Sequence, residues 1–524
     1  MYSVWNLFKK NMTLPYDIRK RVLLGAAGII TGILLFQGLA IDVPFMMTLA
    51  LICFLMLPFI FIWQQLAKQI LVAILTLTLP LNVDQTFNLH ETHIGGAQGY
   101  VVSISGIAIV LLYLLWFSEL HRDRSKRIQW FPAMSVPLLG ILLMSVLSLF
   151  NAPDRPLGWY EILEFFKMFC IFLYISNYVR EKKNFHWVLL FLLAGLFLES
   201  LIALMQSLSG STLNLKILGS AESAYMHKME GERVFRAGGT LGGPNSLAWY
   251  LDFLLPLALA FLFYKLRSMS RMIVTAAFVM GLAALILTLS RGGWLGFLTG
   301  AFLVGLYQLK RLSVKVRMFI VVLMILIAGI GMGLLFGTDN PVKTRLTADD
   351  RGSAYVRLPL MRVAYRMIRA NPLIGNGVNN YTLVHHRYDD TPEQVSIQFP
   401  YPVHNFYLQL AAEIGLPGLL FLLIFLGTVF LRLIRLIPGA KALDKPLFIG
   451  ILAGLCAACI QGLVENCTIG SYHLLPLWFL AGLAAGRMEI CRSDSVRPDA
   501  PQSGIHETSE IQSDGTGEQE RRAR

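Results

Sequence analysis

Repeated apolar runs of about 20 residues are the feature that most constrains the fold of this chain, because a helix of that length crosses the ~30 Å hydrocarbon core of a bilayer. The chain is 55% hydrophobic and only 15% charged, which excludes an ordinary soluble domain. Only helices and closed barrels satisfy their backbone groups in lipid, and runs this long favour helices. We therefore predict an all-α, polytopic membrane protein with about 14 transmembrane helices. The predicted spans are residues 22–40, 43–63, 68–83, 99–118, 131–150, 158–179, 186–208, 244–264, 272–289, 293–309, 316–336, 404–431, 447–465 and 473–488.

Short basic clusters between these spans predict the orientation. When the spans alternate in direction, all of the clusters fall on one side, which the positive-inside rule identifies as cytoplasmic. The net charge of +13 is spread over these clusters, so we expect no nucleic-acid partner. It follows that the loops at 209–243, 290–292 and 337–403 face outward. The clusters lie at residues 9–10, 19–21, 122–127, 180–183, 265–271, 310–317 and 432–445.

The ends of the chain differ from its middle. Residues 1–21 are polar and basic, show no cleavable secretory signal, and are predicted to form a cytoplasmic N-terminus. Residues 22–488 are predicted to form the membrane domain. Residues 489–524 are rich in Ser, Gly, Gln, Glu and Arg and cannot bury enough apolar surface to offset the entropy of ordering, so we expect a disordered cytoplasmic tail.

The segment 351–418 is polar and rich in arginine, although it lies between two long apolar runs. Apolar residues at helical spacing predict a helix that ends at Asn371-Pro372, because the residue before proline avoids the α conformation. Loops of this length are usually functional or disordered, and the regular pattern argues against disorder. The residues expected to share one face of this helix are Tyr355, Leu358, Met361, Val363, Tyr365 and Ile368.

Arginines on the predicted outer side oppose the usual charge bias and therefore indicate an anionic ligand. Arg291 lies between two spans beside Gly292-Gly293, where backbone or ligand can approach closely. Arg357 follows the small residues 352–354 at the expected helix start, and its guanidinium matches phosphate oxygens. Arg236 precedes a glycine-rich stretch and an outward helix start that can receive an anion. The alternative is that these side chains extend to the interface or that long loops translocate regardless of charge.

His404 is the candidate general base. It opens an outward helix between Pro402 and an apolar run, and a histidine can accept a proton near neutral pH. The alternative is a structural histidine. His385 and His386 are interpreted as solvated loop residues. Side chains that can support the site are Asn245, Trp294, Tyr401 and Asn405.

Other chemistries find little support. The sequence has no DxD, no HExxH and no Cys/His set with metal-ligand spacing, so we expect no metal and no cofactor. Cys456 and Cys459 form a CxxC within a predicted span, which is more typical of helix packing than of redox chemistry. Asp252 and Glu199 lie inside predicted spans and are the residues that favour a proton-coupled transporter.

Three motifs resemble the bacterial O-antigen ligase and polymerase superfamily. They are LSRGGW at 289–294, GGTLGGPNSLA at 238–248, and NPLIGNGVNNY followed by PVHNFYLQLAAEIGLPG at 371–418. The resemblance is clearest over 230–435. It implies a C-type membrane glycosyltransferase whose catalytic domain is the membrane domain 22–488, with a large helical loop at 337–403 outside the cytoplasm. Gly415 lies eleven positions after His404, close to the interval at which the ligase pattern has a glycine.

The resemblance implies that a glycan is moved from undecaprenyl diphosphate to an acceptor hydroxyl on the outer face of the bacterial cytoplasmic membrane, without a metal. Carried over by motif, Arg291 and Arg357, with Arg236 nearby, would hold the donor diphosphate, and His404 would activate the acceptor. We expect a ligase that uses a lipid A-core acceptor. The alternatives are a polymerase that extends an O-antigen or exopolysaccharide and, from another class, a proton-coupled transporter or lipid-linked sugar flippase.

Overall fold

The structure is a computed structural model that describes residues 47–48, 52, 56–81, 84–215, 226–229, 232–309, 353–392, 394–441, 443–466 and 471–496. The predicted spans 22–40 and 316–336, about half of 43–63, the first part of the 337–403 loop, the predicted N-terminus 1–21 and residues 497–524 of the predicted tail lie outside these residues. The described beginning of that tail, residues 489–496, is helical rather than disordered, because the last helix (Leu475–Val496) continues through it.

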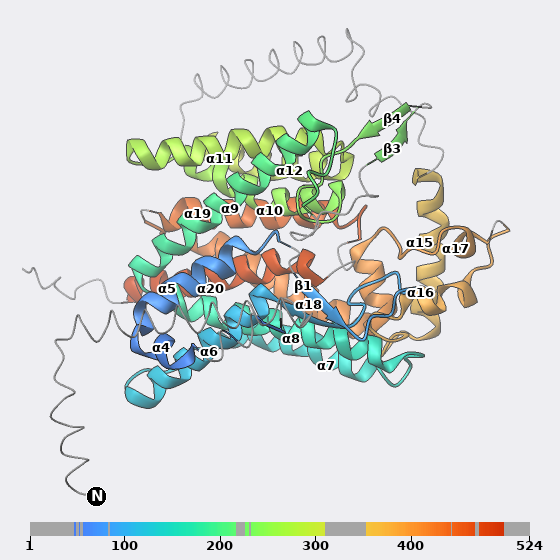
Figure 1. The fold of residues 1–524 in the computed structure, drawn as a ribbon, viewed down its shortest axis with the longest axis horizontal. Helices are drawn as coiled ribbons and strands as arrows, with labels where there is room; N and C mark the ends of the chain where they lie inside the picture. The colour runs from blue at the N-terminus through green and yellow to red at the C-terminus, as the bar shows by residue number, and fades with distance from the viewer. Residues whose placement is uncertain are drawn as a thin grey trace, which may run out of the picture.

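The described part of the chain is mostly helical (Figure 1). Six of its helices are long and apolar enough to cross a membrane: α6, α9, α10, α11, α18 and α19. Two shorter apolar helices, α5 and α7, accompany them. A multi-pass membrane protein is therefore supported, whereas the expected number of about 14 spans is not confirmed. The helices of the bundle are α4 (Leu57–Ile62), α5 (Gln64–Leu77), α6 (Ile104–Arg122), α7 (Pro132–Ser148), α8 (Arg155–Tyr178), α9 (Lys182–Ser209), α10 (Pro244–Leu262), α11 (Ser268–Leu287), α12 (Arg291–Leu309), α18 (Phe406–Leu436), α19 (Asp444–Gln461) and α20 (Leu475–Val496).

One continuous apolar core joins these helices. Small residues let α10, α12 and α19 approach closely, as is common between membrane helices. A Cβ at Gly454 of α19 would lie 2.3 Å from the carbonyl oxygen of Phe253 in α10, and one at Gly300 of α12 would lie 2.9 Å from the carbonyl oxygen of Ala453. Elsewhere α18 packs against α7, α20 against α8, and α9 against α11. The result is a tight scaffold that holds the helix ends in register.

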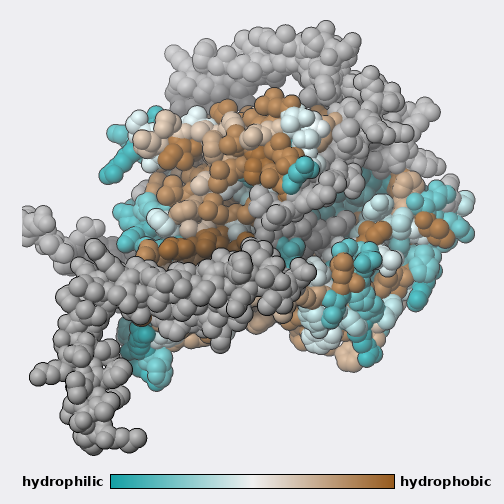
Figure 2. Space-filling model, viewed as in Figure 1, coloured by the Kyte–Doolittle hydropathy of each residue, from teal (hydrophilic) through white to brown (hydrophobic). Residues whose placement is uncertain are grey.

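Small elements gather at one end of the bundle, on the right in Figure 1. They correct the expectation that the described chain is all-α, because two antiparallel hairpins occur here. The first pairs Asp84 with Ser103, and the second pairs Met226 with Phe235. Figure 2 shows a hydrophobic surface over α11 and α12 and a mixed, more hydrophilic surface over α15 to α17. The elements of this end are β1 (Asp84–Phe87), β2 (Tyr100–Ser103), β3 (Met226–Met229), β4 (Glu232–Phe235), α15 (Ser353–Ala370), α16 (Tyr381–Val384), α17 (Val395–Gln398) and the 3-10 helices η2 (His385–Tyr388) and η3 (Ser471–Leu474).

The arginine-rich helix α15 ends at Ala370, before Asn371-Pro372, as the sequence predicts. Of the residues expected to share one face, Val363 and Ile368 are buried, whereas Leu358 and Tyr365 are exposed. His385 is also buried rather than solvated, and its ring nitrogens lie 2.9 and 3.1 Å from the carbonyl oxygens of Thr382 and Ser396. These elements share a small core of their own, formed by Val356, Leu360, Val363, Ala364, Met367, Ile368, Tyr381, Val384, Val395, Val403, Ala411 and Ala412.

A break inside α18 ties this end to the bundle. Gly415 has φ 80° and ψ 171°, a conformation that costs glycine little. The helix bond to Glu413 is lost because Pro417 has no N–H, and Leu416 donates instead to the carbonyl of Pro372 (2.8 Å). The carbonyls of Ala412 and Glu413 accept from the backbone of residues 376 and 377, at 2.9 and 3.0 Å. These bonds, between the 371–377 loop and α18, join the two parts of the 371–418 motif on which the family resemblance rests.

Candidate active site

The short junction between α11 and α12 positions Arg291. Leu289 adopts φ 50°, which turns the chain between the two helices, and α12 begins at Arg291. The indole of Trp294 donates to the carbonyl of Leu285 (3.0 Å) and so fastens the start of α12 to the end of α11. The hydrogen bond of Trp294 therefore stabilises this junction. Arg291 is half-buried at the start of α12.

Arg236 is buried next to this junction. Its Nε donates to the carbonyl of Thr288 (2.8 Å) and its Nη2 donates to Oδ1 of Asn245 (3.0 Å). A buried guanidinium requires such acceptors, because desolvating it without them is costly. The amide of Asn245 donates in turn to Oε2 of Glu465 (2.7 Å). The predicted residues Arg236 and Asn245 thus lie in one chain of hydrogen bonds that ends at Glu465.

Glu465 is the residue that sequence reasoning missed. Its Oε1 lies 3.1 Å from Nδ1 of His404, and the two residues are 61 positions apart in the chain. Burial alone raises the pKa of the Glu465 carboxyl, but the hydrogen bond and charge of His404 and the charge of Arg357 hold it below its ordinary value. The carboxylate is therefore anionic near neutral pH. An acidic residue at the outer end of the predicted span 447–465 was the signal that could have indicated it.

The anionic partner fixes the proton of His404. Since a carboxylate can only accept, Nδ1 must donate to it, and in the neutral ring Nε2 then carries the lone pair. The His404 side chain is 33% exposed, whereas that of Glu465 is 13% exposed. No residue in the described ranges forms a hydrogen bond with Nε2. In the neutral ring, Nε2 is therefore the nitrogen that can accept a proton.

Arg357 lies in the first turns of α15, half-buried, and its charge reaches Glu465. Its Nε is buried and has no hydrogen-bond partner within the part of the chain that the structure describes. A buried donor without an acceptor is uncommon and is explained when a ligand supplies the acceptor. On the same helix Arg366 is paired with Asp390, and Arg362 and Arg369 are exposed. Of these four arginines, Arg357 is the one whose charge lowers the pKa of Glu465, the partner of His404.

The loop at 461–466 brings the pieces together. Gln461 donates to the carbonyl of Asn245 (3.1 Å), and a Cβ at Gly292, next to Arg291, would lie 3.0 Å from Cγ2 of Val464. Asn405 donates to the carbonyl of Leu463 (2.9 Å) and caps α18 by accepting from the N–H of Leu408 (2.9 Å). One loop therefore contacts the starts of α10, α12 and α18.

Two expected supporting residues are not brought into this set of hydrogen bonds. Tyr401 is half exposed, and its backbone N–H donates to the carbonyl of Phe399 (2.8 Å). Trp294 packs against the bundle core. Among the described residues, no group of three or more His, Cys, Asp or Glu could hold a metal ion. The expected independence of metals stays a prediction.

The carboxylate of Glu199 holds the glycine-rich stretch before α10. It accepts from the N–H and the hydroxyl of Thr240, at 2.7 and 2.8 Å. Gln206 also spans this stretch, bonding both the N–H and the carbonyl of Gly239 at 2.8 Å. Asp252 lies buried between α10 and Gly296 of α12. Of the two residues that favour a transporter, Glu199 therefore has a structural role.

A second buried polar cluster lies at the same end and is built around Asn379. Its Oδ1 accepts from the N–H of Gly96 (2.7 Å) and contacts Nε2 of His93 (2.8 Å). Its amide donates to the carbonyls of Ala97 and Leu157, at 2.7 and 3.0 Å. These bonds attach the loop after β1 to α8 and to the start of α16. Burial lowers the pKa of His93, which is consistent with a neutral, structural ring.

The helices and this polar site define a multi-pass membrane protein with a basic, histidine-containing site at one end of its bundle. Residues 276–423 match the family model described as O-antigen ligase. The match includes Arg291, Arg357 and His404 and confirms the resemblance to the O-antigen ligase superfamily. Arg236, Asn245 and Glu465 lie outside the matched residues. No curated protein matches the chain.

Proposed function

We propose that this protein is an O-antigen ligase-like glycosyltransferase that moves a glycan from undecaprenyl diphosphate to an acceptor hydroxyl, with lipid A-core as the acceptor. The family match supports the coarser statement, a membrane glycosyltransferase of the ligase or polymerase type. The observation that carries the proposal is the partly exposed His404 side chain, whose Nδ1 contacts the carboxylate of Glu465. The charge of Arg357 also acts on this carboxylate. We propose further that the site faces outward from the bacterial cytoplasmic membrane, as the distribution of basic clusters predicts.

The proposed reaction is a displacement at the anomeric carbon of the donor. The acceptor oxygen forms a bond to that carbon while the bond to the diphosphate oxygen breaks. The electron pair of the broken bond leaves with the diphosphate, and the hydroxyl proton moves to Nε2 of His404. A positioned general base contributes typically 10²–10⁴-fold to such a step. By accepting from Nδ1, Glu465 leaves the lone pair of the neutral ring on Nε2, and its charge stabilises the charged ring that forms.

Negative charge increases on the diphosphate as it leaves, and Arg357 and Arg291 are proposed to receive it. A fixed guanidinium in a site of low dielectric stabilises such charge without reorganising, which is commonly the largest electrostatic contribution to catalysis. The buried Nε–H of Arg357 supports this role because it lacks an acceptor within the described residues. Arg236 is proposed to act through Asn245, which positions Glu465, rather than by contacting the donor.

The test is transfer in purified form. The protein in nanodiscs would be incubated with an undecaprenyl-diphosphate glycan and either lipid A-core or a second lipid-linked repeat unit, with and without a chelator. Glycan attached to lipid A-core supports the ligase. Lengthened lipid-linked glycan identifies the alternative, a polymerase of O-antigen or exopolysaccharide. Transfer that survives replacement of His404, combined with glycan export lost on replacement of Asp252, would favour the transporter or flippase.

A further inference from the structure

A second basic site lies at the far end of α18. This helix starts beside His404, and Arg432 lies 26 residues after Phe406, which corresponds to roughly 40 Å of helix. There the last turns of α18 and of α20 enclose a cavity of ≈ 330 Å³. The cavity is independent of the proposed active site, since it lies at the opposite end of the bundle.

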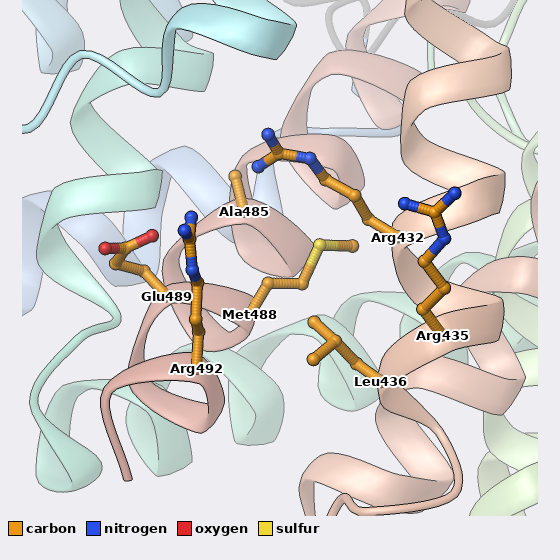
Figure 3. A pocket seen from close by; sticks show the side chains of 7 residues that line it. All are labelled: Arg432, Arg435, Leu436, Ala485, Met488, Glu489 and Arg492. Atoms are coloured by element: carbon orange, nitrogen blue, oxygen red, sulfur yellow. The ribbon is translucent and has the colours of Figure 1, made fainter. Parts of the chain in front are cut away.

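The lining of this cavity combines cations with apolar side chains. Arg432 and Arg435 come from α18 and Arg492 from α20, together with one acidic residue, Glu489. Figure 3 shows the three guanidinium groups pointing to the same side, with Met488 and Leu436 between the two helices. The positive charge therefore exceeds the negative charge at the mouth of a largely apolar cavity.

A neighbouring arginine of α20 shows how this protein satisfies a structural cation. Arg487 forms two hydrogen bonds with Asp444, at 2.7 and 2.8 Å, and lies 4.8 Å from the centre of the Phe185 ring. By contrast, Arg432 and Arg435 form no ion pair with any residue that the structure describes. Arg432 is nevertheless half-buried. The two arginines thus line a cavity without an ion pair to a described carboxylate, and Glu489 is the one acidic side chain of the lining.

We infer that this cavity binds the phosphodiester headgroup of an anionic phospholipid. The planar guanidinium groups match phosphate oxygens, and Met488 and Leu436 offer a surface for the start of an acyl chain. Basic pockets between membrane helices on the cytoplasmic side commonly receive anionic headgroups, and the cluster at 432–445 is predicted to lie on that side. The combination of cations and apolar wall favours a lipid over a free anion.

The experiment measures lipid binding rather than glycan transfer. The full chain in neutral phosphatidylcholine nanodiscs would be titrated with phosphatidylglycerol, with bound lipid read by native mass spectrometry and the thermal midpoint followed in parallel. We expect saturable binding and a rising midpoint, as for any ligand that prefers the folded state. R432Q/R435Q should weaken this binding by about tenfold or more, because each cation near the surface contributes on the order of 1 kcal/mol.

The matched control is R267Q/R271Q, which removes two exposed arginines at the start of α11 on the same predicted side. It should change the affinity by less than about twofold, as expected for two weakly coupled surface charges. E489Q removes the single acidic side chain of the lining and should tighten lipid binding. Tighter binding cannot result from misfolding, so this variant tests the site independently of the arginine variants.

Other results would overturn the inference. Equal weakening by the two arginine pairs would indicate general surface attraction. Inorganic phosphate or glycerol phosphate that binds as tightly as the lipid would identify a free-anion site. Absence of saturable phosphatidylglycerol binding by the full chain would show that this cavity is not a lipid site.

Discussion

The two histidine clusters at the functional end of the bundle differ in one respect that matters for chemistry. His93 is 4% exposed, faces an amide, and has its pKa lowered by burial. His404 has a side chain that is 33% exposed and faces a carboxylate that stays ionised. The first arrangement closes a loop onto helices, whereas the second leaves one ring nitrogen available. Accessibility together with an ionised partner, rather than burial alone, therefore distinguishes a candidate base from a scaffold histidine.

The largest effect is expected from His404→Ala. Loss of the general base should reduce the glycan transfer rate by about 10²–10⁴-fold while the thermal midpoint changes little, because the ring is partly exposed. Initial rates with a purified lipid-linked donor test this. His93→Ala is the matched comparison and should lower the midpoint while the rate per folded molecule stays within about threefold. The reverse pattern would contradict the distinction between the two clusters.

Arg357→Gln is expected to have the next largest effect. Removing one preorganised donor from the leaving group should lower kcat by about 10²–10³-fold. Arg369→Gln, which changes an exposed arginine on the same helix, is the control and should leave kcat unchanged. Equal losses in both variants would mean that α15 attracts the donor through its overall charge only.

Glu465→Gln should lower kcat by about 10–100-fold, because a partner that orients a histidine contributes on that scale. KM for the donor should change less than kcat, since Glu465 is not proposed to touch the donor. Glu465→Asp should restore part of the rate by returning the charge. If glutamine supports full activity, the ionised carboxylate has no role in positioning His404.

Asn379→Ala tests the scaffold cluster. The variant leaves several buried partners unsatisfied and should destabilise the fold by about 1–3 kcal/mol or more. Thermal unfolding in detergent, followed by intrinsic fluorescence, measures this loss. Transfer by the remaining folded protein should be close to that of the unchanged protein. A large fall in kcat without loss of stability would place Asn379 in the reaction.

The smallest effect concerns pH. Because folding depresses the pKa of Glu465, this group stabilises the folded state above its unfolded pKa of about 4.3. That contribution is lost as the pH falls through the lower, folded value. The stability difference between the unchanged protein and Glu465→Gln should therefore shrink as the pH falls below about 4. A difference that grows on acidification would show that the depressed pKa is wrong.

Much of the helical framework could be predicted from the sequence. Proline and glycine mark the end of α15 at Ala370 and the break between α11 and α12, where Leu287 and Arg291 are the adjoining ends. The two hairpins were not predicted, because their strands are only four residues long. Helical spacing on α15 did not reveal which apolar residues are buried: Leu358 and Tyr365 are exposed, since apolar residues beside a membrane need not be buried in the protein.

The candidate site was predictable in its residue types but not in its pairing. The residue type alone suggests a role for His404, Arg357 and Arg236: an imidazole can accept a proton, and a guanidinium can bind phosphate. The bond from His404 to Glu465 joins positions 61 apart, and no local pattern encodes it. Conversely, the two parts of the 371–418 motif include the residues that form the backbone bonds around Gly415. Part of the family signature is therefore architectural.

The break at Gly415 has a kinetic consequence. Through it the helix that bears Arg357 and the helix that follows His404 are joined before any substrate arrives. Hinged closure of one upon the other would require rupturing those backbone bonds. We therefore expect turnover to be limited by substrate entry and product release rather than by closure of these two helices.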